Sequence, residues 1–177
     1  MRSPATAMTA STTSPSVDTE LFRTVMASLA SGVSVVATYD EEDQPRGLTC
    51  SAVCSVSLEP PLLLASVSNR SGTLRAVLER GLFSVSILSA QGQTVSQLFA
   101  SPAADKFERV RWTAGPVTGI PLMPATIGHA ECAVHDAVEA GDHTLLIGRV
   151  VGGGSAQEHL PLTYWRGGYA RLLPDAV

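Results

Sequence analysis

The run from Gly47 to Leu62 constrains the fold of this chain more than any other stretch. Because successive side chains of a β-strand point to opposite faces, an extended run would have one apolar or thiol face and one face rich in hydroxyls. The first face holds Leu48, Cys50, Ala52, Cys54, Val56 and Leu58, and the second holds Thr49, Ser51, Val53, Ser55 and Ser57. Pro60 and Pro61 end the run, since proline has no N–H for a strand ladder. The pattern predicts one strand of an antiparallel sheet.

Two interpretations of the hydroxyl face follow from the pattern alone. It is either an ordinary Ser/Thr-rich outer strand, since Thr is common in strands, or a wall that holds a polar, phosphate-bearing ligand. Short hydroxyl side chains favour the second interpretation, because they let a ligand approach the backbone and they both donate and accept hydrogen bonds. The pattern by itself leaves both open.

Composition limits the class of protein. The chain has 177 residues, a hydrophobic share of 45% and a formal net charge of −4, which fit a single globular domain without an affinity for nucleic acid or an anionic membrane. No apolar run is long enough to span a membrane. Three cysteines, Cys50, Cys54 and Cys132, show no disulfide-framework spacing and favour a reducing, cytoplasmic setting. We interpret Cys50 and Cys54 as small core residues on one strand face, too far apart to form a disulfide.

The order of the patterns predicts a mainly β protein with a few helices. Residues 1–17 read as a disordered tail, and residues 18–177 as one domain. A helix begins near Ser16 or Asp18 and ends at Gly32. Strands then follow over 33–39, 47–58, 62–67, 82–88, 125–138 and 144–151, with helices near 74–80 and 93–99 and a final hairpin around Gly167 and Gly168. Gly152 to Gly154 read as a turn. Short strands separated by turns indicate an antiparallel barrel.

Several segments together resemble the short-chain flavin reductases. G-L-T-x-S-x-x-x-S-V-S-L-x-P-P-L from Gly47, D-K-F-x-x-V-x-W from Asp105, and Gly141-Asp142-His143 match the motifs of that family in order. The resemblance implies an FMN-binding split barrel of the antiparallel Greek-key type. It also implies an NAD(P)H:flavin oxidoreductase that uses NADH or NADPH to reduce FAD or FMN. Such reductases are usually homodimers, and they supply reduced flavin to a separate monooxygenase.

The resemblance also assigns candidate site residues. Those expected to bind flavin and its phosphate are Ser31, Thr49, Cys50, Ser51, Ala52, Ser55, Ser57, Asn69, Arg70, Ser71 and Lys106. Gly141, Asp142 and His143 are expected to locate the nicotinamide, with His143 as the candidate catalytic residue, and Tyr169 to stack near either ring. The chain departs from the family wording at Cys50, Ser51, Ala52 and Cys54, and it lacks the proline that usually precedes Ser31. Lys106 as an exposed ion pair and Tyr169 as a core aromatic remain alternatives.

Other chemistries are less well supported. A helix that begins near Arg70, Ser71 and Thr73 could bind an anion at its N-terminus. An ordinary N-cap beside a surface arginine explains the same residues. His129, Cys132 and His135 cannot converge on a metal, because Cys132 points away from the two histidines on a strand. We keep two alternatives to the reductase: a non-catalytic flavin-binding module, and an oxidase of the pyridoxamine-phosphate type.

Overall fold

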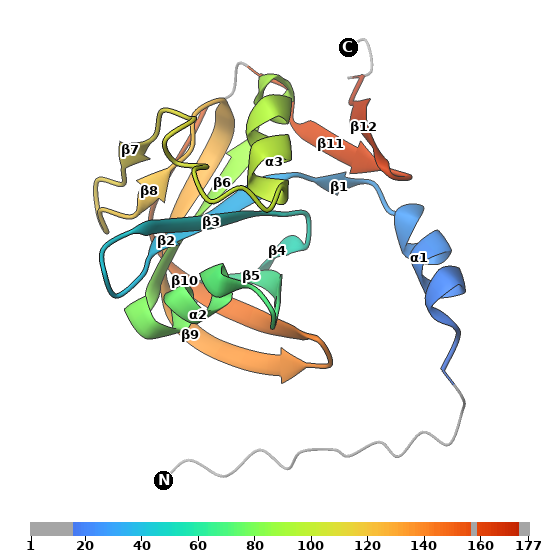
Figure 1. The fold of residues 1–177 in the computed structure, drawn as a ribbon, viewed down its shortest axis with the longest axis horizontal. Helices are drawn as coiled ribbons and strands as arrows, with labels where there is room; N and C mark the ends of the chain where they lie inside the picture. Colours follow the sequence, from blue (N-terminus) through green and yellow to red (C-terminus); the bar gives the residue numbers. More distant parts are fainter. Residues whose placement is uncertain (1–15, 157–158, 174–177) are drawn as a thin grey trace, which may run out of the picture.

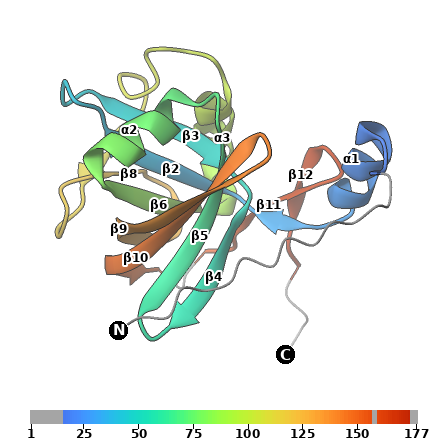
Figure 2. The same cartoon turned by 90° about the horizontal axis from the view of Figure 1, so that it is seen from below.

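The fold centres on a seven-stranded antiparallel sheet. The computed structural model describes residues 16–156 and 159–173, so residues 1–15 of the tail predicted over 1–17 lie outside the described part. The sheet has the strand order β3-β2-β6-β9-β10-β5-β4. Its strands are β2 (Ser34–Tyr39), β3 (Pro45–Cys50), β4 (Val53–Leu58), β5 (Pro61–Ser68), β6 (Leu82–Leu88), β9 (Thr126–Ala140) and β10 (His143–Ser155). The mainly β, antiparallel prediction is confirmed (Figures 1 and 2).

The sheet curls into a barrel, and the place where it closes is the short interruption between strands β3 and β4, which we call the break. These two strands lie at opposite ends of the strand order, yet only Ser51 and Ala52 separate them in sequence. So short a connection requires the two edges of the sheet to meet. At the place where the two edges meet, the Ser66 N–H donates to the Ala52 carbonyl at 2.9 Å. The prediction of one continuous strand over 47–58 was therefore wrong.

The break also changes which face each side chain occupies. Cys50, at the end of β3, is buried, whereas Cys54 on the edge strand β4 is exposed. The interpretation of Cys54 as a core residue was therefore wrong, although both cysteines are free thiols. Val56 and Leu58, on the same edge strand, are also exposed.

Two helices pack on the barrel, and their ends follow local sequence signals. In α2 (Gly72–Arg80) the N-cap Ser71 side chain accepts from the Thr73 N–H, and Gly81 ends the helix in the left-handed conformation at φ 70°. Leu74 and Val77 of α2 are buried against the barrel core. A short 3-10 turn, η1 (Ala90–Gly92), leads into α3 (Gln93–Ala100), which lies against β3 and β2.

The core has two parts. Inside the barrel, Val36, Phe83, Val85, Cys132 and Leu146 are fully or almost fully buried. A second cluster lies between the outer side of β2 and α3, and it includes Val33, Val35, Leu88, Phe99 and Met123. Two short strands, β7 (Thr113–Ala114) and β8 (Pro121–Leu122), form a small separate sheet beside it.

The N-terminal helix stands away from the barrel (Figures 1 and 2). α1 (Thr19–Ala27) begins at Asp18, as predicted, but its C-cap is Ser28 rather than Gly32, which lies in β1 (Ser31–Gly32). β1 pairs with β11 (Leu162–Trp165), and β11 pairs with β12 (Gly168–Arg171). The Arg166 N–H and the Trp165 indole N–H donate to carbonyls at the end of the α1 segment. This small sheet therefore holds α1 to the molecule.

The glycines near the C-terminus behave differently from the prediction. Gly152 to Gly154 continue β10 and pair with β9, so they do not form a turn. Gly153 needs to lack a side chain there, because a Cβ would lie 2.7 Å from the His129 carbonyl on the neighbouring strand. The last hairpin turns at Arg166 and Gly167, both with positive φ, one residue earlier than expected.

Candidate functional site

A hollow of about 350 Å³ opens where the barrel closes. We call it the closure hollow. Residues from β3, the break, β5, α3 and the start of β10 line it, namely Leu48, Thr49, Cys50, Ser51, Ala52, Ser66, Val67, Ser68, Phe99, Ala100 and His143. Five predicted site residues, Thr49 to Ala52 and His143, thus come together from segments far apart in sequence. The volume lies within the range of about 300–1,000 Å³ typical of ligand pockets.

The break between β3 and β4 leaves backbone donors at the hollow. Ser51 and Ala52 belong to no strand, and among the described residues their N–H groups donate to no protein acceptor. Both residues are exposed and line the hollow. A polar backbone group in a concave site calls for a partner. A ligand whose edge carries hydrogen-bond acceptors would satisfy these two donors.

The Cys50 thiol is structural rather than reactive. It donates weakly to the Ser66 carbonyl at 3.4 Å and to the Ala52 carbonyl at 3.7 Å, across the line where the barrel closes. Burial raises the pKa of the Cys50 thiol, which keeps it protonated at neutral pH. Cys50 therefore helps to hold the edges of the barrel together and supplies no nucleophile.

Thr49 is fixed from behind by α3. Its hydroxyl donates to the Ser96 carbonyl at 2.6 Å, and the Ser96 hydroxyl is 2.8 Å from the Tyr169 hydroxyl. The Tyr169 ring also packs edge-on against Tyr164, with 5.5 Å between centroids. Tyr169 thus lies behind the wall of the closure hollow and does not line it. Its contacts position the wall through Ser96.

The Gly141-Asp142-His143 turn is held over the hollow by Asn69. The Asn69 side chain donates to the Gly141 carbonyl at 3.3 Å and accepts from the Thr144 hydroxyl at 2.8 Å. The Asn69 N–H also donates to the Asp142 carbonyl. These contacts fasten the segment after β5 to the β9–β10 turn. Asn69 therefore positions the turn, and its side-chain amide is occupied within the protein.

His143 is oriented by its neighbour in sequence. Its Nδ1 lies 2.8 Å from the Asp142 carboxylate, which leaves Nε2 as the ring nitrogen available to a ligand. The hydrogen bond and the charge of His143 lower the pKa of the Asp142 carboxyl. Arg70, on the facing segment, adds a smaller effect of the same sign.

A second hollow, of about 570 Å³, adjoins the first. We call it the hairpin hollow, because the β2–β3 hairpin forms one side; the start of α2 and residues 103–107 form the others. Leu48 lines both hollows, and the predicted phosphate residues Ser71 and Lys106 line this one. Lys106 Nζ donates to the Phe99 carbonyl at 3.0 Å, and burial lowers the pKa of this ammonium. Within the described residues, Lys106 pairs with no carboxylate.

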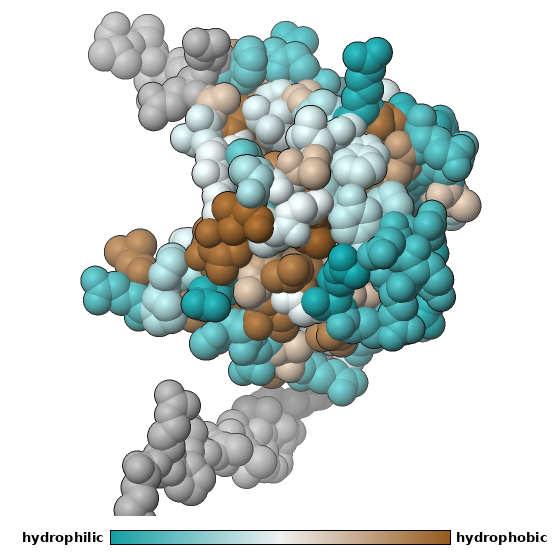
Figure 3. Space-filling model, turned by 90° about the vertical axis from the view of Figure 1, so that its left-hand side faces the viewer, coloured by the Kyte–Doolittle hydropathy of each residue, from teal (hydrophilic) through white to brown (hydrophobic). Residues whose placement is uncertain are grey.

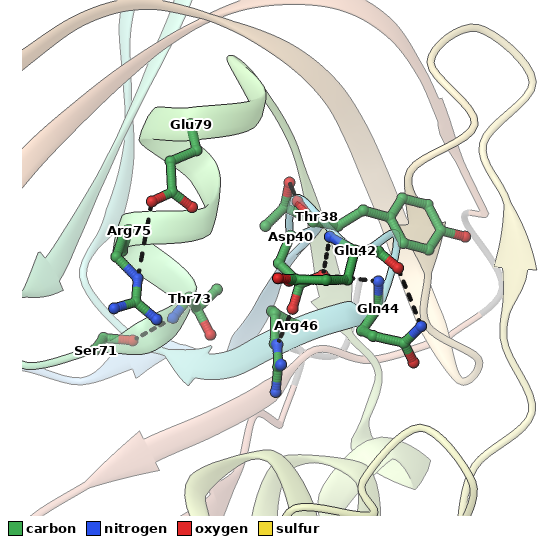
Figure 4. Close-up of polar contacts among 10 residues, drawn as sticks. Thr38, Asp40, Glu42, Gln44, Arg46, Ser71, Thr73, Arg75 and Glu79 are labelled. Carbon is green, nitrogen blue, oxygen red and sulfur yellow. Dashed lines mark hydrogen bonds and ion pairs between the residues drawn. The ribbon is translucent and has the colours of Figure 1, made fainter.

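Asp40 fixes the turn between β2 and β3 (Figure 4). Its side chain is largely buried and accepts from the Glu42 and Gln44 N–H groups and from Arg46 Nε at 2.7 Å. Burial opposes ionisation of Asp40, but these hydrogen bonds outweigh it and lower its pKa. Asp40 thus sets the shape of the turn, and the remaining acids of the tip project outward from it.

Some predicted site residues do not reach either hollow. Ser55 and Ser57 lie on β4, Ser31 lies on β1, and exposed Arg70 lies in the turn between β5 and α2. Their assignment to ligand binding stays a prediction. The described residues contain no group of three or more His, Cys, Asp or Glu side chains placed to hold a metal ion.

Comparison with known proteins identifies the family. The model for a flavin reductase-like domain matches residues 26–173. A flavin reductase (NADH) from Kitasatospora aureofaciens is 49% identical over 88% of this chain and 82% of its own length. This chain belongs to the flavin reductase-like family. The reductase subunit HsaB of a flavin-dependent monooxygenase from Rhodococcus jostii is 33% identical over 90% of this chain and 80% of its own.

Solved structures agree with this flavin reductase-like fold. The NADH:FAD oxidoreductase SgcE6 of Streptomyces globisporus, in complex with NAD and FAD fragments, superposes with a TM-score of 0.85 at 32% identity. The match covers 93% of this chain and all of that one (100%). Nitrilotriacetate monooxygenase component B from Mycobacterium thermoresistibile gives a TM-score of 0.83 at 33% identity, over 88% of this chain and 87% of that one.

The residues of the closure hollow fit a flavin. An isoalloxazine ring has an apolar face and an edge of carbonyl oxygens and ring nitrogens that accept hydrogen bonds. The hollow offers N–H groups at Ser51 and Ala52 that donate to no acceptor among the described residues, and the partly exposed side chains of Leu48, Ser66 and Ser68. The flavin's own ring system supplies the hydride chemistry when it is bound. No nucleophile or metal is needed from the protein.

Sequence reasoning missed part of the wall. Ser66 and Ser68 alternate on β5 and face the hollow, and Phe99 and Ala100 close it from the end of α3. The period-two hydroxyls of β5 carried a signal, but that strand is otherwise apolar and reads as a core strand. Phe99 also belongs to the second core cluster, so its dual role requires the three-dimensional arrangement.

Proposed function

We propose that this chain is an NAD(P)H:flavin oxidoreductase that reduces FAD or FMN by hydride transfer and supplies reduced flavin to a separate monooxygenase. One observation carries the proposal: the closure hollow combines the N–H groups of Ser51 and Ala52, which donate to no acceptor among the described residues, with a histidine on the facing turn. The names of relatives that are flavin reductases or monooxygenase reductase subunits point the same way. The hollow and its surroundings belong to an FMN-binding type of split barrel.

Each group has a defined task in this proposal. The Ser51 and Ala52 amides and the Thr49 segment hold and orient the flavin edge, while Ser71 and Lys106 bind its phosphate. His143, oriented by Asp142 and held over the hollow by Asn69, positions the nicotinamide carboxamide against the flavin. Holding both rings in contact makes the transfer effectively intramolecular, which is the main contribution such a site can make.

We further propose a cytoplasmic homodimer. No residue of α1 is buried, and the side chains of Leu21, Phe22, Val25, Met26 and Leu29 are 45–61% exposed on it and its C-terminal extension. A nine-residue helix with an uncovered apolar face is not stable in water by itself. The opposite side of the molecule is mainly hydrophilic or neutral, with a smaller group of apolar side chains near its centre (Figure 3). A second copy that covers α1 would stabilise it.

Three free thiols support the reducing compartment. In the part of the chain that the structure describes, no helix is long and apolar enough to cross a membrane.

Oxidation of NADH at 340 nm tests the activity. Purified protein should oxidise NADH or NADPH only when FAD or FMN is present. A protein that binds flavin without any pyridine-nucleotide oxidation would contradict the proposal and favour a flavin-binding module.

A further inference from the structure

The C-terminal hairpin reaches the wall of the closure hollow from behind. Tyr169, on β12, places its hydroxyl 2.8 Å from the hydroxyl of Ser96, a residue of α3 that is only 1% exposed. The two residues are 73 positions apart in sequence. A buried hydroxyl calls for a hydrogen-bond partner, because burying it without one costs free energy. Ser96 finds its partner outside its own helix, so the position of α3 depends on the hairpin.

Two contacts of α3 with β3 set the distance between two walls of the hollow. The Ser96 carbonyl accepts from the Thr49 hydroxyl on β3 at 2.6 Å. One turn further along α3, Phe99 lines the hollow and lies against Gly47 of β3, where a Cβ would be 2.9 Å from the Phe99 ring. Tyr169 is therefore bonded to a residue that makes one of these two contacts.

An attachment of this kind matters because α3 is short. It has eight residues, and helices of fewer than about 12–15 residues are marginal in water by themselves. Its N-cap is Gly92, which has no side chain to bond the first amides of the helix. The helix is held instead by its buried side chains, Val95, Ser96 and Phe99. We expect loss of the Tyr169 hydroxyl to let α3 shift on β3 without unfolding the barrel.

The hairpin itself is fixed at several points. Tyr169 pairs with Tyr164 across the β11–β12 ladder, and their rings pack edge to face with 5.5 Å between centroids. On its other side β11 pairs with β1, and the Val33 N–H donates to the Leu162 carbonyl. The Tyr169 hydroxyl is thus presented at a defined place, and a continuous line of contacts leads from the hairpin to the closure hollow.

We propose that Tyr169 is a positioning residue of the reductase, which acts through Ser96 to hold α3 and the Thr49 segment of β3 in the conformation that binds flavin. Tyr169 does not line the hollow itself. The inference rests on the proposed function, because it takes the closure hollow as the flavin site. Its physical basis is a population effect: a site that is competent for only a fraction of the time binds its ligand with a Kd raised by the inverse of that fraction.

Titration of the purified protein with FMN and with FAD tests the assignment. Tyr169→Phe removes one hydroxyl and keeps the ring, so we expect the Kd for both flavins to rise about threefold to tenfold, as the loss of one hydrogen bond allows. Ser96→Ala should raise both Kd values by a similar factor. The variant with both substitutions should bind no more weakly than the weaker single variant, because both changes remove the same bond.

Tyr164→Phe is the matched control. Tyr164 lies opposite Tyr169 on the same hairpin and packs against its ring, but its hydroxyl has no hydrogen-bond partner among the described residues. This variant should bind both flavins as the wild-type protein does. Equal Kd values for Tyr169→Phe and Tyr164→Phe, or fully additive effects of Tyr169→Phe and Ser96→Ala, would overturn the proposal.

Thermal unfolding and spectroscopy separate positioning from stability. A bond that only stabilised the fold would be present with and without flavin, so its loss in Tyr169→Phe would lower the Tm and leave the flavin Kd unchanged. That result would also overturn the proposal. Positioning predicts instead a raised Kd together with an altered visible circular dichroism spectrum of the bound flavin, which Tyr164→Phe should not show. A wild-type protein that binds neither flavin would refute the proposed function rather than the role of Tyr169.

Discussion

Glu131 offers the clearest energetic prediction, because it is a carboxylate with no exposed surface in the middle of β9. Its Oε2 accepts from the Thr118 N–H at 2.6 Å, the Thr118 hydroxyl at 2.7 Å and the Val117 N–H at 3.1 Å. A side chain at Gly115 or Gly152 would collide with this carboxylate or come close to it. Glu131 therefore holds the loop between β7 and β8 on the sheet.

The change Glu131→Gln preserves the shape and one acceptor oxygen but removes the charge. It turns charge-assisted hydrogen bonds into neutral ones, and it places an NH₂ group where Oε1 now accepts from the Val117 N–H at 3.3 Å. Hydrogen bonds to charged groups contribute about 1.5–3 kcal/mol. We expect a loss of about 2–3 kcal/mol in the free energy of unfolding, or about 5–10 °C in Tm for a chain of this size.

The effect should depend on pH with a defined sign. Burial opposes ionisation, but the bonds from Thr118 and Val117 outweigh it, so the pKa of Glu131 lies below its ordinary value. A carboxyl whose pKa is lower in the folded state stabilises the protein above its unfolded pKa of about 4.3 and loses that contribution as pH falls through the folded value. The difference between wild type and Glu131→Gln should thus be complete at pH 7 and shrink below pH 4.

Urea unfolding between pH 3.5 and 7.5 measures this difference, with Glu139→Gln as the control. Glu139 lies on the same strand but is exposed, and its substitution should change stability by less than about 0.5 kcal/mol. A Glu131→Gln variant as stable as the control at pH 7, or one whose deficit does not shrink at low pH, would refute the reasoning.

Two further changes test the site and the assembly. His143→Ala should raise the KM for NADH about tenfold, which corresponds to the loss of one hydrogen bond to the nucleotide, and it should change the flavin Kd much less. Steady-state kinetics measure the KM and flavin titration measures the Kd. An unchanged KM for NADH would exclude the proposed role of His143. Phe22→Asp places a charge on the apolar face of α1, so this variant should be monomeric in light scattering. The control Thr24→Asp changes the other side of the same helix and should remain dimeric. A monomeric wild-type protein would contradict the proposed dimer.

Local signals in the sequence were sufficient for the starts of α1 and α2 and for the end of α2, but not for the end of α1, which is at Ser28 and not at Gly32. The Asp18 cap, the Ser71 cap and the left-handed Gly81 each act within a few residues, so they could be predicted from the chain alone. The Gly152–Gly154 segment shows the limit of such reasoning. Three glycines favour a turn locally, but here they continue a strand, because the His129 carbonyl and the Val117 side chain leave no room for a Cβ.

The break at Ser51 and Ala52 could not be predicted from the local sequence either, because it also depends on the three-dimensional arrangement of the strands. An alternating pattern predicts an uninterrupted strand, whereas closure of the barrel decides that the chain leaves β3 and joins the opposite edge. Bringing Thr49, Ser51 and His143 into one hollow is a consequence of that closure. Only the resemblance to known reductases placed these residues together in advance.

The same break explains why the sequence can differ from the usual motif of the family at Cys50, Ser51 and Ala52. A strand that ends there leaves two N–H groups without ladder partners, and these donors exist whatever the side chains are. Side-chain identity matters more at the turn over the hollow, where Asp142 orients a histidine ring and Gly141 adopts a φ of 65°. Substitutions that preserve the backbone should therefore be tolerated at Ser51 and Ala52 but not at Gly141, Asp142 or His143. The closing of the barrel and, in our proposal, the binding of flavin then depend on the same feature, the two residues that connect β3 to β4.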